Sequence, residues 1–189
     1  MTTETALYDR EKLIALVHEK ALEFGDFTLA SGEKASFYLD CRRLTLDGQG
    51  ANMVAAGILE KLKDSMPDAV GGMAIGADPI SAAVITVAWQ NGQALRGLIV
   101  RKEAKGHGTG RQVEGPVQAG DRVVMMEDVV TTGGSSLRAI AAAREFGLEV
   151  DRLIAIVDRG SNSATVFEEV GVRFDCLLHA NELNTEQGS

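Results

Sequence analysis

The sequence predicts an α/β fold with a mostly parallel central sheet flanked by helices. Short apolar runs typical of buried strands alternate along the chain with segments whose apolar residues recur at helical spacing. The strand-like run at residues 150–157 is apolar enough to be covered on both faces. This alternation predicts parallel strands joined by right-handed crossovers.

The N-terminal quarter of the chain predicts a helix followed by a small hairpin. Apolar residues recur at helical spacing over residues 9–24, and Gly25 has the position of a helix stop. Residues 27–29 and 35–39 are short β-like runs joined by a polar turn. A second helix is expected over residues 49–62.

The middle of the chain predicts two strands and a long polar segment. Residues 69–75 form a buried strand that ends in a phosphate-sized loop at residues 76–79, and residues 80–90 form a helix. The next strand is expected at residues 94–100. Residues 101–120 are too polar and rich in glycine to be either a helix or a strand.

The C-terminal part continues the alternation of strands and helices. The expected elements are a strand at 122–126, a helix ending at Phe146, a strand at 150–157, a helix at 163–170 and a strand at 172–178. The tail from Asn181 is polar, so we expect it to be frayed.

Length and composition limit the classes of function. The 189 residues suit one domain, residues 1–189, with a small N-terminal hood at about residues 1–45 to which the C-terminal segment could contribute. A net charge of -8 and a pI near 4.9 argue against nucleic acid as the main partner. The N-terminus has no apolar signal region, and no apolar stretch is long enough to span a membrane. Cys41 and Cys176 lack the spacing of a zinc or redox site, so we expect reduced thiols. Together these features lead us to expect a cytoplasmic protein.

Residues 123–136 place an apolar strand, two acids and a loop of small residues in succession. Because strands of open α/β sheets present ligands at their carboxyl ends, Glu127 and Asp128 are placed to accept hydrogen bonds from two neighbouring sugar hydroxyls. Hydroxyl groups, a glycine pair that lets backbone N–H groups turn inward, and a serine cap at Ser135 or Ser136 would then face a phosphate. The expected sugar-phosphate site therefore runs from the acid pair to the serine cap.

Alternatives to this site are a simple tight turn and a solvated acid pair. No lysine follows the glycines, so the segment is not the phosphate-binding loop of nucleoside triphosphatases. An acid pair followed at once by Thr-Thr-Gly-Gly-Ser resembles the phosphoribosyl-pyrophosphate signature of the type I phosphoribosyltransferases. That resemblance implies the fold of this family. It also implies a ribose 5-phosphate site made of Glu127, Asp128, Val129, Val130, Thr131, Thr132, Gly133, Gly134 and Ser135.

Residues 101–111 hold four permanent cations, one histidine and three glycines. Glycines keep such a loop mobile and its cations repel one another, so we expect it to become ordered around a polyanion such as pyrophosphate. A solvated surface hairpin is the alternative. The run from Arg101 to Lys105 followed by Gly-His-Gly closely resembles the catalytic loop of the orotate phosphoribosyltransferases, and residues 27–32 and 158–160 resemble the hood segment and the pyrimidine-binding corner of the same family.

The resemblance implies a role for several residues of this sequence. Arg101, Lys105 and His107 would reach into the active site of a partner subunit in a homodimer, and Lys102 would bind the diphosphate from its own subunit or across the dimer. The catalytic residues implied are Lys105, His107, Arg101, Lys102 and Asp128. The substrates implied are phosphoribosyl pyrophosphate and orotate.

Orotate would be bound by Thr131 and Arg159, with Tyr38 and Leu39 packed on the pyrimidine ring. A guanidinium reads a carboxylate through two parallel hydrogen bonds, which suits Arg159 to the carboxylate of orotate, whereas an arginine in a surface turn is the alternative. Packing in the core is the commoner fate of residues such as Tyr38.

Two positions depart from some members of the family. Ala30 stands where some members have lysine, and the loop from Gly76 to Pro79 has no lysine for the diphosphate.

We expect no direct protein ligand for Mg²⁺, because the diphosphate, ribose hydroxyls and water can complete its octahedron.

The resemblance therefore implies transfer of the 5-phosphoribosyl group to orotate, giving orotidine 5'-monophosphate and pyrophosphate in pyrimidine biosynthesis. One alternative is another purine or pyrimidine phosphoribosyltransferase, which would need no anion fork for its base. The other is a regulator that binds phosphoribosyl pyrophosphate without catalysis. Such a regulator is expected to carry a basic nucleic-acid-binding module, for which the length and acidity of this chain leave no obvious room.

Overall fold

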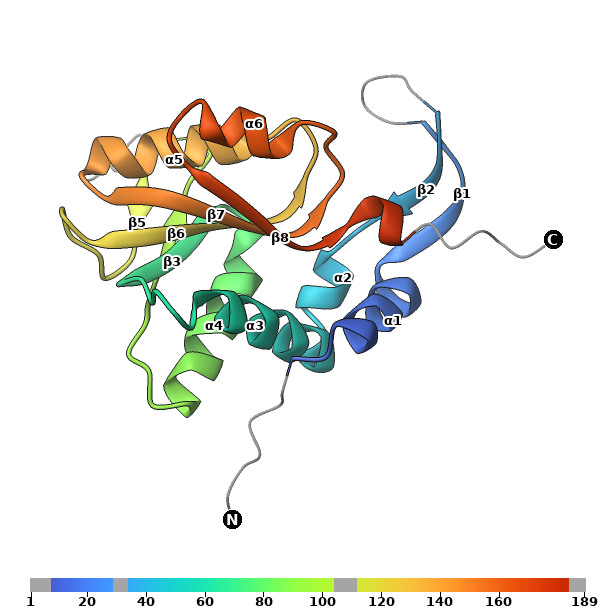
Figure 1. Ribbon diagram of the computed structural model, residues 1–189, viewed down its shortest axis with the longest axis horizontal. Helices are drawn as coiled ribbons and strands as arrows, with labels where there is room; N and C mark the ends of the chain where they lie inside the picture. Colours follow the sequence, from blue (N-terminus) through green and yellow to red (C-terminus); the bar gives the residue numbers. More distant parts are fainter. Residues whose placement is uncertain (1–7, 29–33, 104–111, 184–189) are drawn as a thin grey trace, which may run out of the picture.

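The computed structural model describes residues 8–28, 34–103 and 112–183, which form a mixed, mostly parallel sheet flanked by helices (Figure 1). Neighbouring strands of this sheet are parallel except β4 and β5, which are antiparallel. The predicted fold class is thereby confirmed. In spatial order the strands are β5 (Val113–Glu114), β4 (Arg96–Val100), β3 (Ala69–Met73), β6 (Arg122–Val130), β7 (Glu149–Asp158) and β8 (Arg173–His179).

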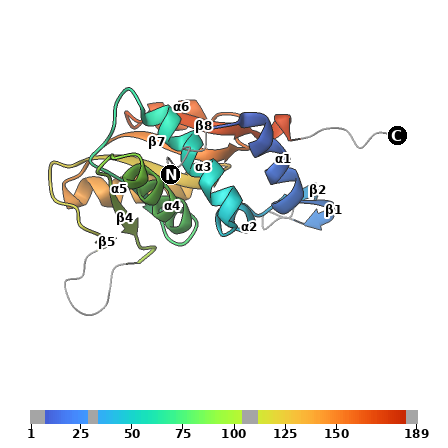
Figure 2. The same cartoon turned by 90° about the horizontal axis from the view of Figure 1, so that it is seen from below.

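Helices cover both faces of the sheet (Figures 1 and 2). One face packs against α3 (Gly48–Leu62) and α4 (Ala77–Gln90), and the other against α5 (Gly134–Phe146) and α6 (Ser163–Glu168). Successive side chains of β6 alternate between the two cores: Val124 lies in the first and Val123 in the second. A central strand apolar on both faces therefore fixes the three-layer arrangement.

Capping residues define the ends of two of these helices. Asp47 caps α3 by accepting hydrogen bonds from the backbone N–H groups of Gln49 and Gly50. Gly147 ends α5 in the left-handed conformation with φ 102°, as its position behind Phe146 predicts.

The N-terminal segment differs from its sequence-based prediction. It consists of α1 (Arg10–Lys20), the antiparallel strands β1 (Leu22–Thr28) and β2 (Lys34–Leu39), and α2 (Arg42–Thr45). The helix expected to reach residue 24 ends at Lys20, because Leu22 pairs with Leu39 and the Ala21 carbonyl accepts from the Asp40 N–H. Pairing with a distant segment outweighs the local helical spacing.

Other boundaries also move. The strand expected at 69–75 ends at Met73, and residues 77–79 form the first turn of α4 rather than a loop. The segment expected to lack regular structure contains the short strand β5, which pairs with the end of β4.

The tail from Asn181 is not frayed where the structure describes it. The turn η1 (Ala180–Glu182) follows β8, and the Leu183 side chain is fully buried in the core. An ion pair between Arg10 and Glu182 joins this turn to α1. The C-terminal segment therefore packs against the N-terminal elements.

Candidate active site

The acid pair lies inside β6, at its carboxyl end, rather than after a strand ending at residue 126. Glu127 is opposite Ala155 of β7 in the strand register, and β6 continues to Val130. Glu127 is buried and Asp128 is half-buried. Because β6 continues through residues 127–130, both carboxylates are attached to strand backbone, which fixes their positions better than a loop would.

The serines after the glycine pair bind Glu127 instead of capping the helix. The hydroxyls of Ser135 and Ser136 donate to Glu127 Oε2 at 2.9 and 2.7 Å. The cap residue of α5 is Gly133, whose φ is 76°, and it makes no side-chain cap hydrogen bond. The expected serine cap is thus wrong, because the buried carboxylate is the stronger acceptor for both hydroxyls.

This arrangement leaves the start of α5 suited to an anion. No side chain in the part of the chain that the structure describes accepts a hydrogen bond from the backbone N–H groups in the first turn of α5. The positive end of the helix favours negative charge at the same place. A phosphate group therefore matches the loop that joins β6 to α5.

Burial is the main electrostatic influence on Glu127. It raises the pKa of the Glu127 carboxyl above its ordinary value, the hydroxyls of Ser136 and Ser135 oppose that shift, and the neighbouring Asp128 adds to it. The fold therefore buries the Glu127 carboxyl group where its surroundings disfavour the ionised form. Such a position is typical of a functional site.

The connection between β3 and α4 lies beside the acid pair. A Cβ on Gly76 would lie 3.0 Å from Asp128 Oδ1, so the backbone here approaches the carboxylate closely. The peptide bond between Ala74 and Ile75 in the same connection is cis. Burial raises the pKa of Asp78 in the first turn of α4, and its Oδ1 is buried with no hydrogen-bond partner among the described residues.

Arg159 stands at the carboxyl end of β7, next to the loop that follows β6. Its backbone N–H donates to the Val130 carbonyl at 2.8 Å. A Cβ on Gly160 would lie 2.5 Å from the Thr131 carbonyl, so only glycine lets the two loops approach this closely. The structure thereby brings Arg159 and Thr131 to the same edge of the sheet as the acid pair.

The hairpin contributes a residue that the sequence interpretation missed. The Arg159 guanidinium lies over the Phe37 ring, 4.9 Å from its centroid. Leu39 is buried in the core, and Tyr38 is 41% exposed and packs against Phe27 with ring centroids 5.7 Å apart. The alternation of side chains along β2 could have pointed to Phe37, because it shares a face with the buried Leu39.

The structure describes only residues 101–103 of the cationic segment, residues 101–111. The Arg101 N–H donates to the Gln112 carbonyl at 2.9 Å, and the Arg101 guanidinium lies 3.7 Å from Glu114. Lys102 is exposed. Lys105, His107 and Arg111 lie outside the described residues, as does Ala30 of the hairpin.

Comparison with known proteins decides the family. The orotate phosphoribosyltransferase of Rhodopirellula baltica is 48% identical over 192 residues, which cover 98% of this chain and all of that protein. No protein-family model matches the chain. The chain belongs to the orotate phosphoribosyltransferase family.

Solved structures agree with this assignment. The orotate phosphoribosyltransferase of Mycobacterium tuberculosis H37Rv in complex with Fe(III) dicitrate has a TM-score of 0.83 and 35% identity, covering 93% of this chain and 98% of that one. The same enzyme in complex with 5-phospho-alpha-D-ribosyl 1-diphosphate has a TM-score of 0.79 and 31% identity, covering 92% and 98%.

Membership of the orotate phosphoribosyltransferase family makes the chain an enzyme with the type I phosphoribosyltransferase fold. The fold extends beyond orotate enzymes, since an adenine phosphoribosyltransferase from Leishmania donovani has a TM-score of 0.63 at 15% identity. Within the described ranges no helix is both long and apolar enough to cross a membrane.

Proposed function

We propose that this chain transfers the 5-phosphoribosyl group from phosphoribosyl pyrophosphate to orotate, forming orotidine 5'-monophosphate and pyrophosphate in pyrimidine biosynthesis. Family membership supports the reaction. The position of Arg159 is the observation that carries the choice of base. Its guanidinium, held over Phe37 and next to the β6 loop, offers two parallel hydrogen bonds to a carboxylate.

The acid pair and the following loop would hold the ribose 5-phosphate. Glu127 and Asp128 would accept hydrogen bonds from the 2- and 3-hydroxyls of the ribose, and residues 129–135 would surround the 5-phosphate. The uncapped start of α5 supports this assignment, as does the anchoring of Glu127 by two serine hydroxyls.

The reaction needs no nucleophile from the protein. The ring nitrogen of deprotonated orotate forms a bond to the anomeric carbon, and the C–O bond to the diphosphate breaks with its electron pair leaving on the diphosphate oxygen. Arg159 and Thr131 would orient orotate for this attack. Carboxylates near the sugar favour the positive charge that develops on its carbon in the transition state.

The cationic segment would stabilise the leaving diphosphate. We propose that Arg101, Lys105 and His107 act in the site of a partner subunit of a homodimer, with Lys102 also on the diphosphate. Lys105 and His107 are the candidates to donate a proton to it. The absence of a lysine between Gly76 and Pro79 supports a larger part for this segment.

The residues present fit a Mg²⁺ ion held mainly by substrate. The acid pair offers two carboxylates, and Glu127 is already bound by two hydroxyls, so the pair does not form a carboxylate cage for a metal. When bound to the diphosphate, Mg²⁺ neutralises part of the charge that accumulates there. Asp128 would contact it through water.

The proposal extends to the organisation and location of the protein. We propose one domain over residues 1–189, with a hood formed by about residues 1–45 and the C-terminal turn. The ion pair between Arg10 and Glu182 supports that contribution. Free thiols at Cys41 and Cys176 suit a reducing compartment such as the cytoplasm.

Release of pyrophosphate tests the choice of base. The full chain is mixed with Mg²⁺, phosphoribosyl pyrophosphate and either orotate, uracil or hypoxanthine. Orotate alone should support release, and Asp128→Asn should abolish most of it while the fold is retained by circular dichroism. Release with uracil or hypoxanthine would favour the alternative transferases, and binding without release would favour a regulator.

A further inference from the structure

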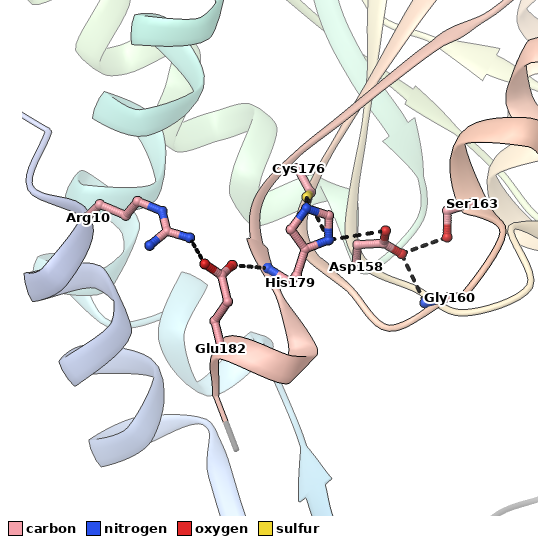
Figure 3. Close-up of polar contacts among 7 residues, drawn as sticks. All are labelled: Arg10, Asp158, Gly160, Ser163, Cys176, His179 and Glu182. Carbon is pink, nitrogen blue, oxygen red and sulfur yellow. Dashed lines mark hydrogen bonds and ion pairs between the residues drawn. The ribbon is translucent and has the colours of Figure 1, made fainter. Parts of the chain in front are cut away.

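Three residues of β7 and β8, next to the proposed orotate ligand Arg159, bring together a carboxylate, a thiol and an imidazole. Asp158 ends β7, Cys176 lies in β8 and His179 ends β8, and Asp158 is opposite His179 in the strand register (Figure 3). One ligand atom from each residue lies within 4.8 Å of the other two. They are the one such group among the residues that the structure describes.

We propose that Asp158, Cys176 and His179 bind a thiophilic divalent cation of the zinc class, distinct from the Mg²⁺ that accompanies the diphosphate. Sulfur, nitrogen and oxygen donors together suit Zn²⁺ and Co²⁺, whereas Mg²⁺ prefers oxygen alone. Three protein ligands leave the fourth position of a tetrahedron for water.

The separations of the ligand atoms match such a site. Zinc–ligand bonds of 2.0–2.3 Å at a tetrahedral angle place neighbouring ligand atoms roughly 3.3–3.6 Å apart. His179 Nδ1 lies 3.5 Å from Asp158 Oδ2 and 3.7 Å from Cys176 Sγ, and the same sulfur lies 3.5 Å from His179 Nε2. A cation bound to Nδ1 therefore requires the His179 or Cys176 side chain to rotate until the sulfur faces that nitrogen.

The surroundings orient the three ligands. Asp158 is buried, and its Oδ1 accepts from the Gly160 N–H at 2.9 Å and the Ser163 hydroxyl at 2.6 Å, which leaves Oδ2 directed at His179 (Figure 3). The backbone N–H of His179 donates to Glu182, which also pairs with Arg10, so the end of β8 is held in place. Hydrogen bonds to a ligating carboxylate, such as those that Asp158 accepts, hold metal sites in shape.

Charge balance and access favour occupancy. On binding, the Cys176 thiol releases its proton to solvent and forms a sulfur–metal bond, so thiolate and carboxylate together cancel the two positive charges of the cation. The His179 side chain is 60% exposed, which opens the site to solvent. An ion here would join the ends of β7 and β8 directly beside Arg159.

Titration with Co²⁺ tests the proposal without reference to catalysis. The full chain, stripped with a chelator and kept reduced, is titrated with Co²⁺ in the absence of substrates. We expect a thiolate-to-cobalt charge-transfer band together with the visible bands of four-coordinate Co²⁺, saturating at one equivalent and displaced by Zn²⁺. Oxygen ligands at Glu127 and Asp128 cannot produce the charge-transfer band.

Two variants and two matched controls complete the test. Cys176→Ser should abolish the charge-transfer band, and His179→Ala should weaken Co²⁺ binding about tenfold or more. Cys41→Ala and His18→Ala, which change a cysteine and a histidine outside the cluster, should behave as the unmodified chain. Absence of the band in the unmodified chain, or its persistence in folded Cys176→Ser, would overturn the proposal.

Discussion

Replacing Arg159 is the perturbation that bears most directly on the choice of orotate. The guanidinium is half-buried over Phe37, and its backbone is fixed by the hydrogen bond to Val130. We expect Arg159→Ala to leave the fold intact, because the backbone contacts remain. The orotate carboxylate would lose its partner.

The structure gives the size of the expected loss. Two charge-assisted hydrogen bonds are worth about 1.5–3 kcal/mol each, and partial exposure places their joint value near the lower end, about 3–4 kcal/mol. Since 1.4 kcal/mol is a factor of ten, kcat/KM for orotate should fall about 100- to 1000-fold. Arg159→Lys keeps the charge but not the fork, so we expect a loss of about tenfold or more.

Phe37 provides an internal check on the geometry. Phe37→Leu keeps apolar bulk but removes the ring below the guanidinium, a contact worth about 0.5–1 kcal/mol at a partly exposed site. A loss of about two- to fivefold in kcat/KM follows, and it should disappear when Arg159 is already alanine.

The assay is steady-state release of pyrophosphate at limiting orotate. Arg173→Ala is the matched control, because Arg173 begins β8 at the opposite end of the strands and its side chain is 66% exposed. Recognition of the orotate carboxylate by Arg159 is refuted if kcat/KM of Arg159→Ala stays within about threefold of the unmodified chain, or if lysine serves as well as arginine.

Three further predictions concern the acid pair and the loops. Because burial raises the folded-state pKa of Glu127 above its unfolded value, ionisation of this carboxyl opposes folding. In urea titrations, the unfolding free energy of the unmodified chain relative to Glu127→Gln should therefore fall as pH rises through the folded-state pKa and then level off. A difference between the two chains that does not change with pH would contradict this. Gly133→Ala should lower the unfolding free energy by about 1–3 kcal/mol, because φ is 76° and the new Cβ would lie 2.8 Å from Phe167, whereas Gly134→Ala, with its nearest neighbour at 3.7 Å, should change it by about 0.5 kcal/mol or less in the same titrations. Lys105→Ala should lower turnover by orders of magnitude in the pyrophosphate assay with little change in melting temperature, and unchanged turnover would remove the loop from the mechanism.

The sequence was sufficient to predict the fold class because the strand and helix patterns of the central sheet are strong. Boundaries failed where contacts between distant segments decide them. Residues 22–24 continue a helical pattern, yet Leu22 joins a strand because Leu39 lies opposite it. No local pattern carries that information.

The candidate site was predictable in its residue types but not in its hydrogen bonds. The succession of strand, acids and small residues placed Glu127 at the correct edge of the sheet. The hydrogen bonds that Glu127 accepts from Ser135 and Ser136 were not predicted, because β6 was expected to end at residue 126 and instead extends to Val130. Similarly, the contact between Arg159 and Phe37 joins segments more than a hundred residues apart, and only the folded chain brings the Phe37 ring under this guanidinium.

A crystal structure of the chain with bound orotidine 5'-monophosphate measures the central arrangement most directly. We predict the ribose hydroxyls about 3 Å from the carboxylates of Glu127 and Asp128, the phosphate at the start of α5, and the pyrimidine carboxylate on the Arg159 guanidinium. A nucleotide bound elsewhere, or bound here with its carboxylate facing away from Arg159, would contradict the account.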